Sequence, residues 1–169
     1  SGVSLRPVNA PTHLVRGLLG AGSMITYFHA IARLPVGDAV LLTYLSPLLV
    51  AVMAPWTVGE TPSLRVWVAL GLGIVGVALV AGPVAADDPI GVACALAAAF
   101  FAASAYLSVK VLTRTDNAIA IVFWFSVSGS VWSSVAIVDG MAPITRPVLV
   151  SLVGIGVVGA AAQWALTRA

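Results

Sequence analysis

Long uncharged stretches, each bounded by charged or turn-forming residues, follow one another along this chain. The stretch from Ala39 to Gly59 holds 21 uncharged residues between Asp38 and Glu60. As a helix that rises about 1.5 Å per residue it would measure about 31 Å, which matches a hydrocarbon core about 30 Å thick. We therefore interpret this stretch as a helix that crosses a membrane.

Five further stretches have the same pattern, and Pro, Gly and Asp residues separate them. The uncharged part of the first one, between Arg16 and Arg33, covers only 16 residues. Both arginines are expected to reach the interfaces by snorkelling, which recovers the length. The sequence thus predicts an all-α integral membrane protein with six transmembrane helices. These are expected at residues 12–32, 39–59, 66–81, 89–109, 118–138 and 148–168.

Composition excludes several other classes of protein. Hydrophobic residues make up 60% of the chain and charged residues 8%, against roughly 25% charged residues in soluble domains. A net charge of +2 is too small and too dispersed for a nucleic-acid interface. One cysteine, Cys94, allows no intrachain disulfide, and no residues have the spacing of metal ligands. We expect lipid contact, no cofactor and no bound metal.

Pro47 stands near the middle of the second span. Its ring removes one N–H and clashes with the carbonyl of Thr43, which costs a soluble helix about 3 kcal/mol. In a membrane bundle the hydroxyls of Thr43 and Ser46, neighbouring helices or cavity water can satisfy the freed carbonyl. Two interpretations stay open: a bent helix that lines a solute cavity, and a packing kink with no solute nearby.

Polar and aromatic side chains inside the spans are the candidate solute contacts. His29 shares a helix face with Gly22 and Thr26, and polar residues in membranes usually face the bundle interior. Its imidazole would contact a solute or a proton, or it would be a neutral ring hydrogen-bonded to a backbone carbonyl. Packing is the alternative role for the aromatic candidates. The other candidates are Tyr27, Thr43, Tyr44, Ser46, Tyr106, Trp124 and Gln163.

Two glycine motifs match G-x-G-x-x-G, at residues 71–76 and 154–159. A dinucleotide site would place such a motif at a turn from strand to helix, whereas both lie inside apolar spans. Small residues let membrane helices approach closely, so helix packing is the preferred interpretation.

A serine stripe runs along the fifth span and either packs against a neighbour or lines a pore. It consists of Ser126, Ser130, Ser133 and Ser134. Ser128 followed by Gly129, together with His29, would suggest an intramembrane serine protease, since a serine nucleophile needs a base. The match is poor because this histidine precedes the serine. We expect no enzymatic activity.

Basic residues are distributed unequally between the two sides of the predicted bundle. Six of the eight fall on the side of the Ser1 end: Arg6, Arg16, Arg65, Lys110, Arg114 and Arg168. By the positive-inside rule that side is cytoplasmic. The chain begins at Ser1 without a leader pattern and stops inside the last span, so we expect it to be part of a longer protein.

Several motifs, taken in order, resemble EamA-type members of the drug/metabolite transporter superfamily. They are Arg16-Gly17-Leu-Leu-Gly20, residues 27–35, Ser46-Pro47-Leu48, Ala81-Gly82-Pro83, residues 121–126 and residues 162–169. The resemblance implies ten helices in two inverted repeats of five, with both termini cytoplasmic. This chain would supply the third to eighth helices, with residues 1–83 in the first repeat and residues 84–169 in the second.

The resemblance also implies a function. The protein would be a secondary transporter, a permease or exporter of small metabolites, that works in the bacterial inner membrane by alternating access. Its solute would bind near the midplane, close to Pro47. The alternative is a non-transporting assembly or accessory module whose glycine faces bind partner helices. Association between copies of the chain is left open.

Overall fold

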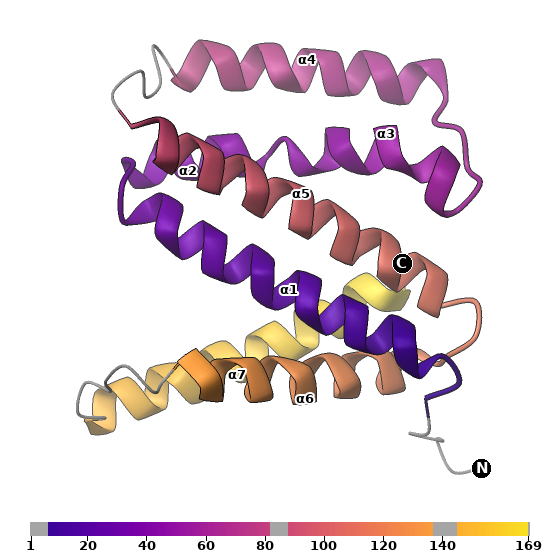
Figure 1. Ribbon diagram of the computed structural model, residues 1–169, viewed down its shortest axis with the longest axis vertical. Coiled ribbons are helices and arrows are strands. Elements are labelled where there is room, and N and C mark those ends of the chain that lie inside the picture. Colours follow the sequence, from indigo (N-terminus) through magenta and orange to yellow (C-terminus); the bar gives the residue numbers. More distant parts are fainter. Residues whose placement is uncertain (1–6, 82–87, 137–144, 169) are drawn as a thin grey trace. The chain divides into compact units, whose positions relative to one another are not determined.

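A computed structural model describes residues 7–81, 88–136 and 145–168, and this part of the chain is helical apart from its turns (Figure 1). The predicted connections at 82–88 and 139–147 lie mostly outside the described residues. The helices are α1 (Ala10–Ile31), α2 (Val36–Thr43), α3 (Ser46–Thr57), α4 (Leu64–Ala81), α5 (Pro89–Leu112), α6 (Ala118–Ala136) and α7 (Arg146–Arg168). The predicted all-α class is confirmed.

Three helical stretches are long and apolar enough to cross a membrane: Val36–Thr57, Pro89–Leu112 and Arg146–Ala165. Shorter apolar stretches lie in α4 and α6, at Leu64–Gly76 and Ala118–Trp132. α1 has 22 residues but is not among these apolar stretches, since it carries charged and polar side chains. Each span predicted from the sequence overlaps one or two helices in the described part of the chain, residues 137–138 of the fifth span lie outside that part, and the ten-helix inverted repeat stays a prediction.

The second predicted span is two helices rather than one. α2 ends at Thr43 and α3 begins at Ser46, so the helix is interrupted at Tyr44 and Leu45. Pro47 lies in the first turn of α3, where its missing N–H costs nothing. A proline disrupts the turn that precedes it, because its ring excludes the carbonyl four residues earlier. The bend that we expected at Pro47 therefore lies just before it.

Packing divides the chain into two units. Unit 1 comprises residues 1–18 and 108–169, and unit 2 comprises residues 19–107. α1 and α5 contribute to both units. The repeat boundary predicted between residues 83 and 84 concerns a sequence duplication, which packing does not address, so it stays a prediction.

The core of unit 2 lies where α1, α2 and α5 meet. Its buried residues are Ala30, Leu34, Ala39 and Ala95, and Cys94 packs against them. Gly91 allows α5 to approach the end of α1, because a Cβ there would lie 2.8 Å from Cγ of Leu34. Small residues at these positions bring the helices into close contact, as expected in a membrane.

Asp88 caps the start of α5 in unit 2. Its Oδ1 accepts a hydrogen bond of 2.9 Å from the Gly91 amide, and its Oδ2 lies 3.3 Å from Nη1 of Arg33. The Gly91 amide and then Arg33 hold the pKa of this carboxyl below its ordinary value of 3.8. A carboxylate at a helix N-terminus is stabilised in this way. The cap joins the ends of two neighbouring helices.

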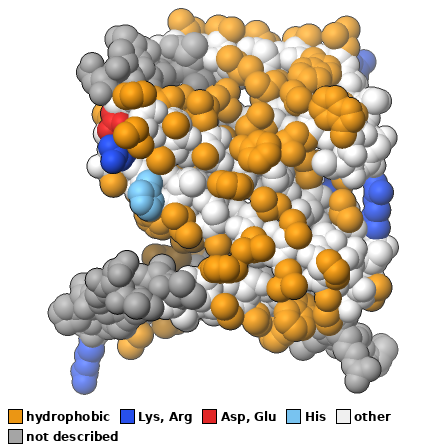
Figure 2. Space-filling model, in the orientation of Figure 1, with side chains coloured by type: hydrophobic (Ala, Val, Ile, Leu, Met, Phe, Trp, Pro, Cys, Tyr) orange, Lys and Arg blue, Asp and Glu red, His pale blue; other side chains and the backbone are white. Residues whose placement is uncertain are grey.

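Unit 1 packs the first half of α1 against α6 and places α6 beside α7. A Cβ at Gly17 would lie only 2.4 Å from Cβ of Ser128. The two backbones therefore come as close as a glycine permits. Large apolar side chains are exposed in both units, and hydrophobic side chains predominate on the face shown in Figure 2. Such a surface suits lipid or further helices.

Candidate functional site

A groove in unit 2 brings together three residues predicted from the sequence. Ser46 and Pro47 of α3 and Tyr106 of α5 line it, together with Val50, Ala102 and Ala103, and its volume is about 500 Å³. We call it the α3–α5 groove. It begins immediately after the interruption between α2 and α3, and Tyr106 is 45% exposed. A hydroxyl, a phenol and an apolar wall can bind an amphipathic solute.

Thr43 and Tyr44 were expected beside this site, but neither is among the groove's lining residues. The Thr43 hydroxyl donates a hydrogen bond of 2.7 Å to the Val40 carbonyl, so this hydrogen bond stays within α2. Tyr44 caps the C-terminus of α2 and is 63% exposed. The structure gives both residues roles at the end of α2.

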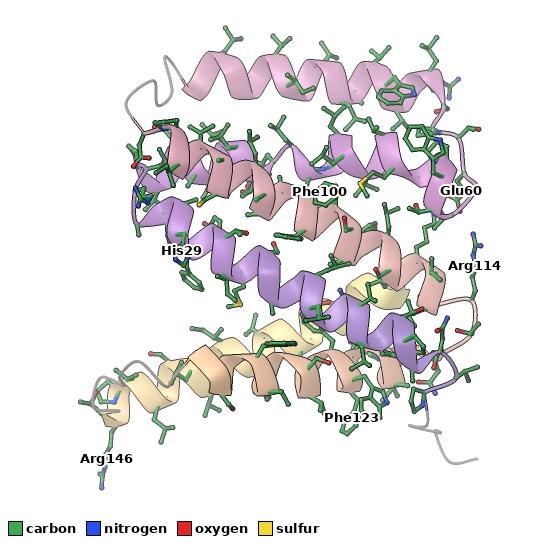
Figure 3. The ribbon with its side chains drawn as sticks, in the orientation of Figure 1. His29, Glu60, Phe100, Arg114, Phe123 and Arg146 are labelled. Carbon is green, nitrogen blue, oxygen red and sulfur yellow. The ribbon has the colours of Figure 1, made fainter. Side chains whose placement is uncertain are left out.

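His29 lies in the last turn of α1, not deep inside the span where the sequence placed it. Its Nδ1 lies 2.8 Å from the Ile25 carbonyl, and Figure 3 shows the side chain on the outer side of α1. Because a carbonyl only accepts hydrogen bonds, Nδ1 carries a hydrogen and Nε2 is the nitrogen that can take up a proton. This is the backbone-bonded arrangement that the sequence left as an alternative.

Tyr27 and Trp124 are packed against other rings. The Tyr27 ring centroid lies 6.1 Å from that of Phe28. The Trp124 ring lies 5.8 Å from Phe123 in a T-shaped arrangement and 6.4 Å from His13. Neither side chain lines a groove described here, so their role in solute binding stays a prediction.

A second groove lies between α6 and α7 in unit 1. It has a volume of about 210 Å³ and is lined by Val122, Phe125, Ser126, Ile155, Gly156, Gly159, Ala160 and Gln163. We call it the α6–α7 groove. Gln163 is the one predicted site residue that it contains. Among the lining residues no side chain is acidic.

Arg16 is a residue that sequence reasoning missed as part of a site. It is only 5% exposed, so other side chains enclose it, and whether its head group reaches the interface stays a prediction. Its guanidinium carbon lies 4.3 Å from the centre of the Phe125 ring, and its Nη2 donates a hydrogen bond of 3.1 Å to Oε1 of Gln163. The sequence did contain one sign of this contact, because Arg16 and Gln163, a cation and an amide, both belong to apolar spans.

Three hydroxyls of the serine stripe donate hydrogen bonds to backbone carbonyls of α6 itself. The hydroxyls of Ser126, Ser130 and Ser134 each donate to the carbonyl four residues earlier, at 2.8 to 3.0 Å. The side chain of Ser133 lies outside the described residues. Serine and threonine do this commonly within membrane helices. The stripe therefore does not require a polar neighbour, and Ser128 instead packs on Gly17.

Asp116, in the turn between α5 and α6, organises a polar cluster in unit 1. Its carboxylate accepts hydrogen bonds from the Val8 amide at 2.8 Å and the Thr115 hydroxyl at 2.7 Å. Nε2 of the buried His13 lies 3.4 Å from Oδ1. Burial raises the pKa of Asp116, but these three partners outweigh it and hold the pKa below 3.8.

This cluster was also missed, because the sequence of the turn indicates only a tight connection. The cluster ties the segment before α1 to the turn between α5 and α6. In the described part of the chain, His, Cys, Asp and Glu side chains form no group of three placed to bind a metal.

Comparison with known proteins adds the family. The profile of the EamA-like transporter family matches residues 2–82. A pseudopaline exporter of Pseudomonas aeruginosa is 32% identical over 176 residues, which cover 100% of this chain and 60% of the relative. A riboflavin transporter of Vibrio cholerae is 29% identical over 168 residues, which cover 98% of this chain and 56% of the relative. No solved structure matches.

The apolar helices and these matches indicate a multi-pass membrane protein. The resemblance to EamA-type transporters predicted from the motifs is confirmed: residues 2–82 match this family, and the relatives similar to the chain are named as an exporter and a transporter. It spans about 60% of the length of the pseudopaline exporter that it matches.

Proposed function

We propose that the full-length protein is a secondary transporter, a permease or exporter of small metabolites, that works in the bacterial inner membrane by alternating access. The observation that carries the proposal is the interruption at Tyr44 and Leu45, in the middle of a 22-residue apolar span. Inverted-repeat transporters place solutes at such broken helices, because unwound backbone offers polar groups at the midplane. The α3–α5 groove begins at this interruption.

The proposed orientation has the Ser1 end in the cytoplasm. The excess of basic residues on that side supports it. Two polar contacts are compatible with the predicted sides. Asp116 contacts His13, and both belong to the predicted cytoplasmic side, whereas Arg33 pairs with Asp88 on the opposite side.

Flux through proteoliposomes that contain the full-length protein tests the proposed function. The names of the relatives supply two first solutes, pseudopaline and riboflavin, to which a panel of small metabolites is added. We expect flux of at least one solute above that of protein-free liposomes. If none of them crosses faster than in protein-free liposomes, the transporter proposal fails.

Tyr106 is expected to contribute to solute binding in the α3–α5 groove. Replacing Tyr106 with alanine removes a ring that lines the groove, and stacking on such a ring contributes about 0.5–1.5 kcal/mol. We therefore expect KM for the transported solute to rise about two- to tenfold. Tyr27→Ala is the matched control, because that tyrosine lies in α1, away from the interruption, and is not among the residues that line the groove. A larger effect of Tyr27→Ala would show that the wrong tyrosine has been assigned.

Proton coupling through His29 is a further part of the proposal. The hydrogen on Nδ1 is directed to Ile25, so Nε2 would exchange the proton. His29→Gln is expected to flatten the dependence of transport on pH between 5 and 8 while leaving measurable flux. Uptake or efflux with the wild-type pH profile in this variant would exclude the coupling role.

One observation favours the second candidate, a membrane assembly or accessory module. A Cβ at any glycine of the two motifs, for instance Gly73 in α4 or Gly156 in α7, would meet no atom within 4 Å. Both glycine faces can therefore pack against partner helices. In a transporter, the helices of the protein outside this chain would be such partners. A solute that raises the Tm of the purified full-length protein favours the transporter, since binding stabilises the folded state.

A further inference from the structure

Arg16 is a buried cation in a chain with few charges, and the α3–α5 groove gives it no role. A charged group inside a membrane protein is costly unless other groups compensate its lost hydration, and such residues usually mark a solute or ion pathway. Arg16 is 5% exposed. The question is therefore what its charge acts on.

Two contacts of Arg16 are specific. The guanidinium lies over the Phe125 ring, at 4.3 Å from the centroid, which is a cation–π geometry. Its Nη2 donates to Oε1 of Gln163 at 3.1 Å. Because a guanidinium can only donate, Gln163 must turn its oxygen toward Arg16, and this fixes the orientation of the amide.

Both contacted side chains line the α6–α7 groove. Phe125 belongs to the α6 wall, and Gln163 belongs to the α7 wall together with Gly156 and Gly159. A Cβ on either glycine would meet no atom within 4 Å, so there is room for a solute beside the backbone. The positive charge lies one side chain away from this space, in an environment where low polarity strengthens electrostatic attraction.

We propose that the α6–α7 groove selects solutes that carry an anionic oxygen group, with a carboxylate as the simplest case. Arg16 is the positioning residue that sets this preference, by its charge and by orienting Gln163. The inference rests on the proposed transport function and names its substrate class. A cationic solute would be repelled, and the lining offers it no acidic side chain.

Matched acid and amide probes test the preference in the purified full-length protein. The pairs are nicotinate with nicotinamide and benzoate with benzamide, and isothermal titration gives a Kd for each. We expect the wild type to bind each acid at least tenfold more tightly than its amide. Arg16→Gln is expected to bring this ratio close to one. Arg16→Lys keeps the charge and is expected to retain the acid preference with weaker binding overall.

Two further variants separate selectivity from folding. Arg114→Gln removes the same charge from the exposed turn after α5 (Figure 3) and is expected to keep the wild-type ratio. Gln163→Glu places a carboxylate beside Arg16 with almost no change of shape, and is expected to abolish the acid preference. If Arg16→Gln does not elute as a single folded species, Gln163→Glu still tests the acid preference.

The outcomes distinguish this inference from the proposed function. A wild type that prefers the amides, or that binds none of the four probes, overturns the inference. So does an acid preference that survives in both Arg16→Gln and Gln163→Glu, or one that is lost equally in Arg114→Gln. In these cases flux in proteoliposomes still supports a transporter. Absence of any flux overturns the proposed function and this inference with it.

Discussion

Alanine in place of Gly17 is expected to lower the free energy of unfolding by about 1–3 kcal/mol, the range for overpacking a close contact. The new Cβ would lie 2.4 Å from Cβ and 2.7 Å from Oγ of Ser128. α1 and α6 would have to separate, and they would lose close packing that lipid cannot replace. Titration with sodium dodecyl sulfate in mixed micelles measures the change in the full-length protein.

Two controls make the Gly17 prediction specific. Gly71→Ala introduces the same methyl group in α4 where no atom lies within 4 Å, and removing a helix-interior glycine is mildly favourable, by about 0.5–1 kcal/mol. Combining Gly17→Ala with Ser128→Gly should restore much of the lost stability, because the clashing Cβ is removed. Equal unfolding midpoints for Gly17→Ala and Gly71→Ala would contradict the close contact.

The helices could be predicted because lipid leaves a spanning segment few alternatives. Backbone groups in hydrocarbon must find partners within the segment, so an uncharged stretch of sufficient length is helical. The position of the interruption before Pro47 was predicted less accurately than the helices were. A proline acts on the carbonyl four residues earlier, and the turn at which the helix breaks depends on neighbouring contacts that the pattern does not contain.

The candidate site could be predicted only in part. The convergence of Ser46 and Pro47 with Tyr106 depends on which side of α3 faces α5, and that is a property of tertiary packing. Polarity is an ambiguous guide inside a helix, because a hydroxyl such as that of Thr43 can bond to its own backbone. Composition alone does not distinguish such a residue from one that contacts a solute.

Arg16 and Asp116 show why charges near span ends are hard to interpret. From the sequence, Arg16 is expected to snorkel to the interface with water, and Asp116 indicates only a tight turn. The structure instead gives each specific partners far away in the sequence: Gln163 for Arg16 and Val8 for Asp116. Whether a charge faces water or another helix is decided by packing between segments.

Asp116→Ala is expected to destabilise the full-length protein by about 3 kcal/mol, the magnitude for removing one partner of a buried charged network. The carboxylate accepts from the Val8 amide and the Thr115 hydroxyl and lies beside His13. Its removal leaves two donors and a buried imidazole without their shared partner. Asp38→Ala, in the first turn of α2, is the control and should cost about 0.5 kcal/mol.

The dependence on pH isolates the charge of this carboxylate. Because the folded pKa of Asp116 lies below 3.8, its ionised form stabilises the folded state at higher pH. This contribution disappears as the pH falls through the folded pKa. Asp116→Asn keeps the shape without the charge, so the wild type should exceed it in stability at pH 5, and the difference should narrow toward pH 3. A difference that stays constant between these values would mean that the hydrogen bonds, and not the charge, hold α1 to this turn.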